Sequence, residues 1–119
     1  NVGRIINYGG AHGQLLGACT MGAGYALMEE LVVEGGRTLS GSLESFLIPT
    51  SLDAPETITK LLEIPEPLGP HGAVGIGEPS LMPTAPAIVN AVSDAIGIRL
   101  TQIPLTPERV LAAIEGAEQ

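Results

Sequence analysis

The stretch that decides how this chain folds runs from Gly69 to Pro86 and reads GPHGAVGIGEPSLMPTAP. Its recurring glycines remove side-chain bulk, so backbone N–H groups can approach a bound group closely. Glu78 is the only ionised side chain in the stretch, and the proline after it disfavours a helical conformation at Glu78. A helical pattern begins near Thr84 and ends at Gly97. A glycine loop that presents one carboxylate ahead of a helix suits anion or cofactor binding beside a general base, although a plain connecting turn has the same composition.

Length and charge exclude several classes of protein. The chain has 119 residues, enough for one domain but short for two. Its net charge of -8, from 5 basic and 13 acidic residues, argues against a nucleic-acid partner, because phosphates are neutralised by clustered Lys and Arg. Cys19 is the single cysteine, which excludes an internal disulfide and a thiolate-only metal site and favours a reducing cytoplasm. Because the sequence starts at Asn1 with no charged and apolar leader, we expect an excised or processed piece without a signal peptide.

A helix is predicted from Gln14 to about Leu31, after a loop at residues 8–13. The uncharged run from Gly13 to Met28 is shorter than the roughly 20 apolar residues of a membrane span, so we interpret it as a buried core helix and expect no membrane partner. Small residues recur at a spacing of four and leave a flat strip on one face. Each interior glycine costs about 1 kcal/mol of helix propensity. We therefore expect another backbone or a flat ligand to pack against this strip.

The remaining pattern predicts an α+β fold, a single small domain of about three helices and three or four short strands. The expected strands lie at residues 2–7, 38–48, 57–64 and 98–103, with a turn at residues 34–37. The last helix should begin with Thr106 as N-cap and Pro107 in its first turn, because a Thr hydroxyl caps free N–H groups and proline tolerates that position.

Blocks spread over nearly the whole chain carry a family resemblance. They are NVGRIIN (1–7), GQLLG (13–17), GYALMEEL (24–31), LIPTS (47–51), GIGEP (75–79), PTAPAIVNAV (83–92) and LTPERVL (105–111). In this order they resemble the last domain of the molybdenum-binding subunit of the xanthine dehydrogenase and aldehyde oxidase family. The resemblance implies that residues 1–119 are the C-terminal portion of a larger molybdopterin-binding domain.

The resemblance implies a molybdenum hydroxylase that inserts oxygen from water into an aldehyde or an N-heterocycle. Activity would belong to the parent subunit, a molybdenum-dependent oxidoreductase, rather than to the isolated chain. The implied cofactor is molybdenum–molybdopterin, alone or as a dinucleotide, and none is expected on the isolated fragment. The remainder of the subunit, together with 2Fe-2S and FAD domains or subunits, would be its partners.

The same resemblance places roles on particular residues. The catalytic glutamate of the family falls on Glu78, and its pterin-contacting glutamine falls on Gln14. The backbone of Gly75, Ile76 and Gly77 would line the molybdenum pocket. A positioned carboxylate can take up a proton while the metal supplies the nucleophile, so the chemistry suits Glu78.

Three positions depart from the family pattern and bear on the substrate class. Val74 replaces a frequent basic residue, Met21 replaces a glutamine, and Asn1 replaces an acid. We expect no protein ligand to the metal from this chain, since His12 and His71 lie far apart with no carboxylate at ligand spacing. The alternative from the residues alone is a non-catalytic structural or assembly module whose glycine loop only connects two elements.

Overall fold

The longest element of the computed structural model, which describes residues 1–117, is helix α1 (Tyr8–Leu27). It begins at Tyr8 rather than at Gln14, so the predicted loop at residues 8–13 is wrong. The cause is Asn7, whose side-chain Oδ1 accepts the N–H of Gly10 at 2.9 Å and caps the helix. This cap compensates the glycines of the first turn. The helix ends at Leu27 rather than near Leu31, with Met28 as its C-cap.

The other two predicted helices are confirmed. Helix α2 (Thr84–Ile96) ends at Gly97, whose φ of 70° is the left-handed conformation that favours glycine after a helix. Helix α3 (Pro107–Ala117) has Thr106 before it, and the Thr106 hydroxyl accepts the Arg109 N–H at 3.4 Å. A hydrogen bond from its own backbone N–H, followed by one from Thr106, lowers the pKa of Glu108 in this first turn.

Strands are fewer and shorter than predicted. Among the described residues the sheet consists of one antiparallel hairpin, β1 (Val33–Glu34) and β2 (Arg37–Thr38). This hairpin confirms the turn at residues 34–37. The expected strand at 38–48 is therefore reduced to its first residue, and 57–64 and 98–103 form no strand among residues 1–117. Residues 2–7 contribute an isolated antiparallel bridge between Gly3 and Ala73. A short 3-10 helix, η1 (Pro70–Gly72), precedes that bridge. A strand requires a ladder of backbone hydrogen bonds to a neighbour, and among the described residues the segment 57–64 makes such a bond to another segment only at Leu62.

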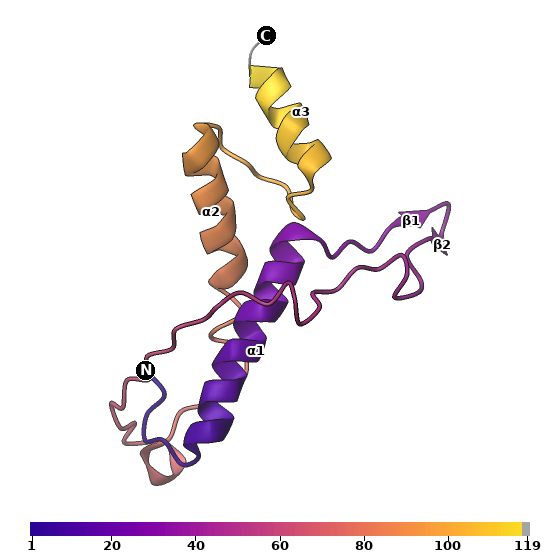
Figure 1. Ribbon diagram of the computed structural model, residues 1–119. Helices are drawn as coiled ribbons and strands as arrows, with labels where there is room; N and C mark the ends of the chain where they lie inside the picture. Colours follow the sequence, from indigo (N-terminus) through magenta and orange to yellow (C-terminus); the bar gives the residue numbers. More distant parts are fainter. Residues whose placement is uncertain (118–119) are drawn as a thin grey trace.

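The core is thin and made of small side chains. Helix α2 packs against the C-terminal half of α1 (Figure 1), and Ala26 in that half is 0% exposed. No large side chain of the described residues is fully buried, whereas Leu52, Ile58 and Leu68 are more than nine-tenths exposed. The Cα radius of gyration is 17.9 Å, against about 13.5 Å for a compact domain of this length. The chain is thus an open framework with much apolar surface uncovered.

The C-terminal part is tethered to the end of α1. The backbone N–H of Leu105 donates to the carbonyl of Ala26 at 2.6 Å. Glu30 forms an ion pair with Arg109. Because Arg109 also donates to the carbonyl of Pro104 at 2.9 Å, it fixes the start of α3 against α1. None of the described helices has the length and hydrophobicity that a membrane span requires.

Candidate functional site

The glycine loop and α1 meet through one side chain. The side-chain Nε2 of Gln14 donates a hydrogen bond of 2.7 Å to the carbonyl oxygen of Gly77, across 63 positions of sequence. Gln14 lies within α1, because the helix starts earlier than predicted. The bond places Gln14 beside the residue that precedes Glu78, so two of the sequence-predicted site residues are brought together directly.

Two cavities flank this hydrogen bond, and Gln14 and Gly77 line both. One has a volume of about 300 Å³ and lies between the N-terminal segment, the start of α1 and the glycine loop. The other, of about 220 Å³, lies along the next turns of α1. The first is lined by Val2, Arg4, Ile5, Ile6, Asn7, Gly10, Ala11, Gln14, Ala73, Val74, Ile76 and Gly77. The second is lined by Gly13, Gln14, Gly17, Ala18, Met21, Gly77 and Leu81.

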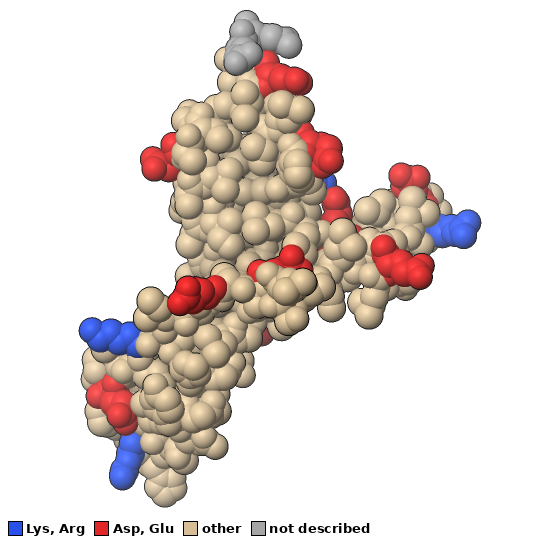
Figure 2. All heavy atoms as spheres, viewed as in Figure 1, with Lys and Arg blue, Asp and Glu red and all other residues tan. Residues whose placement is uncertain are grey.

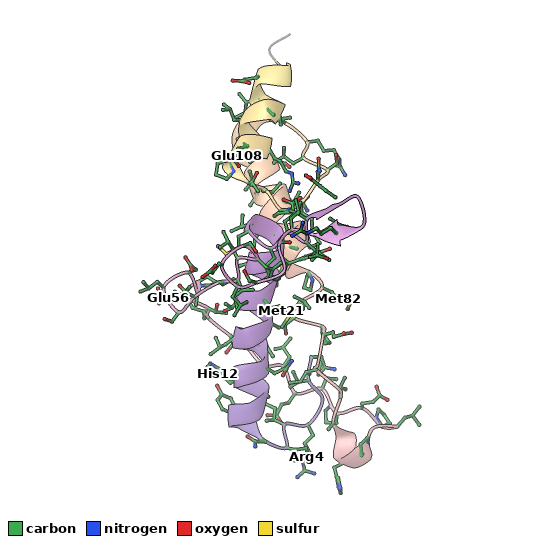
Figure 3. The ribbon with its side chains drawn as sticks, turned by 90° about the vertical axis from the view of Figure 1, so that its right-hand side faces the viewer. Arg4, His12, Met21, Glu56, Met82 and Glu108 are labelled. Atoms are coloured by element: carbon green, nitrogen blue, oxygen red, sulfur yellow. The ribbon has the colours of Figure 1, made fainter. Side chains whose placement is uncertain are left out.

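A larger hollow of about 670 Å³ continues the row along α1 and α2. Met21 and Leu81 line both this hollow and the 220 Å³ cavity. Figure 3 labels Met21 on α1 and Met82 on the segment before α2, and both line the larger hollow. Sequence reasoning missed Leu81 and Met82 as lining residues. Their place directly after the loop that carries Glu78 was the available signal.

The glycine loop is open on its outer side. A Cβ added at Gly75 or at Gly77 would meet nothing within 4 Å. Ile76 is half-buried and lines the 300 Å³ cavity with Gln14 and Gly77, whereas Gly75 is exposed and does not line it. The structure therefore brings Gln14, Ile76 and Gly77 to one cavity and leaves Gly75 at its edge.

Glu78 is held by its backbone, and its side chain is exposed. The Glu78 carbonyl accepts the N–H groups of Leu81 at 2.9 Å and Met82 at 3.2 Å, in the turn that leads into α2. A further bond of 2.6 Å, from the Thr84 hydroxyl to the carbonyl of Ser80, ties this turn to the helix start. Glu78 lines none of the three cavities described above. Glu78 therefore directly follows the residue that Gln14 contacts, and its side chain is exposed to solvent.

The donor set around Gln14 fits a flat, hydrogen-bonding cofactor. After the bond to Gly77, the Gln14 amide still has a second N–H to donate and a carbonyl oxygen to accept. The added-Cβ positions of Gly13 and Gly17 on α1 meet nothing within 4 Å, so a planar group could lie close to the backbone there. Figure 2 shows a largely uncharged face over the helices, with Lys and Arg at the periphery. The described residues contain no cluster of three or more His, Cys, Asp or Glu side chains able to hold a metal ion.

A glycine-lined helix face and a glycine loop, joined through one amide, leave open space on which a flat group could lie. Residues 1–55 match the family described as molybdopterin cofactor-binding domain. The chain is 38% identical over 110 residues to a xanthine dehydrogenase molybdenum-binding subunit of Escherichia coli O157:H7, an alignment that covers 91% of this chain and 15% of the relative. It is also 38% identical over 112 residues to an aldehyde oxidoreductase molybdenum-binding subunit of E. coli K12, over 92% of this chain and 15% of the relative.

Solved structures agree with the sequence relatives. The chain superposes on quinoline 2-oxidoreductase from Pseudomonas putida 86 with a TM-score of 0.89 and 33% identity, over 96% of this chain and 15% of that one. The chain therefore belongs to the family of molybdenum-binding subunits of xanthine dehydrogenases and aldehyde oxidoreductases. It spans about 15% of the length of these relatives.

Proposed function

We propose that this chain is the C-terminal portion of a molybdopterin-binding domain, and that Glu78 is the general base of the hydroxylase to which it contributes. The observation that carries the proposal is the Gln14–Gly77 hydrogen bond, which joins the glycine-lined helix to the residue before Glu78. The relatives named above include enzymes of xanthine, aldehyde and quinoline oxidation, which supports an aldehyde or an N-heterocycle as substrate.

The overall reaction converts a substrate C–H bond into C–OH, takes the oxygen from water, and releases two electrons and two protons. The molybdenum–molybdopterin group, when bound, supplies the oxidising chemistry and accepts the electrons. Glu78 accepts a proton, because its carboxylate stands beside the loop that would line the cofactor. Gln14 orients that loop through Gly77 and offers its remaining amide atoms to the pterin. Iron–sulfur and flavin domains or subunits would carry the electrons onward, and the cytoplasmic location predicted from the sequence is part of the same proposal.

The exposure of Glu78 fits this role only if the remainder of the subunit covers it. An open carboxylate is solvated and exchanges protons with water, whereas an active site that excludes water strengthens the electrostatic interactions of its groups. We infer that segments outside this sequence complete the pocket, since the relatives are several times longer than this chain. The exposed carboxylate also favours the second candidate, an assembly module without a catalytic role.

Glu78→Gln in the complete cofactor-loaded enzyme separates the two candidates. The amide has the same shape but does not accept the proton, so turnover should fall by about 100-fold or more. Molybdenum content should stay unchanged, because the substitution leaves Gln14 and the loop in place. Glu56→Gln is the matched control, since Glu56 (labelled in Figure 3) is also an exposed glutamate, lies outside the glycine loop and lines none of the three cavities, so turnover should stay unchanged. Normal turnover of Glu78→Gln would leave only the assembly module.

A further inference from the structure

Residues 56–62 form an extended segment without a sheet partner along most of its length. In Figure 1 the chain beyond the hairpin passes α1 and continues without helix or paired strand toward the N-terminal end. The exposure along the segment alternates with a period of two. Thr57, Thr59 and Leu61 are half-buried, whereas Ile58, Lys60 and Leu62 are exposed. A period of two is the signature of a β-strand with two unequal faces.

The segment already touches a rudimentary sheet at its C-terminal end. The N–H of Val2 donates to the carbonyl of Leu62 at 2.9 Å, and the N–H of Val74 donates to the carbonyl of Val2 at 3.2 Å. The side chain of Asn1 accepts the N–H of Ile64 at 2.9 Å. Three chain segments therefore lie side by side, with the N-terminal residues in the middle and residues 62–64 at one margin.

The outer edge of this segment carries free backbone groups. Among residues 1–117, no backbone hydrogen bond joins residues 56–61 to another segment. Because the Leu62 carbonyl points toward Val2, alternation turns the N–H and C=O groups of Thr57, Thr59 and Leu61 to the opposite side. A row of free donors and acceptors on an extended chain is a template for strand pairing.

The side chains of the segment are those of a covered strand. Ile58 is 93% exposed and Leu62 is 48% exposed, on the face that also carries Lys60. β-branched residues at positions 57–59 favour a pleated conformation that packs against neighbours. An isoleucine so exposed on an unpaired strand is an aggregation liability unless another surface covers it.

We propose that residues 57–61 pair, along this outer edge, with a β-strand from the part of the same subunit that lies outside this sequence. The inference rests on the proposed function, in which this chain is a segment of a longer subunit. The length of the relatives supports this occupant, since about 85% of their chain lies beyond the aligned region. The structural superposition on quinoline 2-oxidoreductase includes 96% of this chain, so an extended path of this kind is compatible with a complete enzyme. The added strand satisfies the free groups of Thr57, Thr59 and Leu61 and places cross-strand side chains beside Ile58 on the same face.

Amide hydrogen exchange in the complete, cofactor-loaded subunit tests the pairing. The N–H groups of Thr57, Thr59 and Leu61 should exchange at least about 100-fold more slowly than in an unstructured peptide of the same sequence, because ladder hydrogen bonds must open before exchange. Exchange at the unstructured rate in an active subunit would overturn the strand pairing.

Two substitutions at Thr59 give an independent test. Thr59→Pro removes the N–H donor, whereas Thr59→Ala shortens the side chain and retains the donor. We expect the proline variant to lower the yield of soluble complete subunit at least about tenfold and the alanine variant to preserve both yield and protection. Equal yield and equal protection in the two variants would contradict the proposal.

The exchange measurement separates this inference from the proposed function. Protection at residues 57–61 together with normal turnover of Glu78→Gln would refute the base role and retain the strand. Loss of turnover in Glu78→Gln without protection would retain the base role and refute the strand.

Discussion

The two halves of α1 share one pattern of small residues and have different surroundings. In the C-terminal half, a Cβ added to Gly22 would lie 2.5 Å from the Cβ of Thr84, and one added to Gly24 would lie 2.6 Å from the ring of Pro49. In the N-terminal half, a Cβ added to Gly13 or Gly17 would meet nothing within 4 Å. The glycines of the first kind are required by contacts inside this chain. Those of the second kind have no contact here that explains them.

The contrast shows that a glycine strip predicts close approach without identifying the neighbour. Each interior glycine costs about 1 kcal/mol of helix propensity, so both halves of the helix need a compensating contact. Helix α2 supplies it around Gly22. Around Gly17 the contact would come from the cofactor or from the rest of the subunit. Gly17 lines the same cavity as Gln14 and Gly77, which supports a neighbour on this side of the helix.

Of the three substitutions on α1, Gly22→Ala in the packed half should have the largest effect on stability. The new methyl group overlaps Thr84 at the start of α2, and overpacking of this kind costs about 1–3 kcal/mol. Amide exchange in the complete subunit should show the local opening of α1 and α2 becoming easier by that amount. Adding Thr84→Gly should recover part of the loss, because the two positions are in contact. A Gly22→Ala variant with unchanged exchange would show that the packed half is not tight.

Gln14→Ala should have a smaller effect and tests the join between α1 and the glycine loop. Losing an exposed hydrogen bond costs about 0.5–1.5 kcal/mol, so the amides of residues 75–78 should exchange faster. Turnover should fall by about tenfold, less than for Glu78→Gln, since the carboxylate itself is retained. Thr20→Ala is the control on the same helix, because the Thr20 hydroxyl donates only to the carbonyl of Leu16 in its own helix. Equal turnover in Gln14→Ala and Thr20→Ala would remove Gln14 from the site.

Gly17→Ala should have the smallest effect on stability, and it should stabilise α1 whereas Gly22→Ala destabilises it. Without cofactor, the added methyl group meets open space, and α1 should gain about 0.5–1 kcal/mol of stability. With cofactor, the same methyl group would narrow the open strip, so the molybdenum content of the purified subunit should fall. Gly116→Ala in α3 is the matched control, since it also meets nothing within 4 Å and lies outside the three cavities. Equal molybdenum content in both variants would indicate that the open half does not face the cofactor.

Local signals predicted the helices well. Thr84, Gly97, Thr106 and Pro107 mark helix boundaries that the structure confirms, and at Gly97 and Thr106 the reason is capping, which depends on neighbouring residues only. The start of α1 was predicted too late, since the glycines after Tyr8 outweighed the Asn7 cap in the sequence pattern. The strands at 38–48, 57–64 and 98–103 were over-predicted for these residues. Their propensity is strand-like, but a strand needs a partner that propensity does not supply.

The candidate site shows the same division. The motif blocks placed Gln14 and the loop 75–77 in the sequence, and the structure joins them through Gly77. The catalytic role of Glu78 and the pterin contact of Gln14 stay predictions, since they involve groups outside this chain. Only the tertiary structure shows that Leu81 and Met82 line a hollow together with Met21 of α1.

By itself, the sequence determined the family, both ends of α2, the start of α3 and the positions of small residues, because these depend on local backbone preferences and on the order of motif blocks. Only the tertiary structure decided which glycines are packed, how Gln14 reaches Gly77, and that Arg109 pairs with Glu30. The physical reason is that close contacts join residues far apart along the chain. Their geometry follows from how α1, α2 and the glycine loop pack together, which no local pattern encodes.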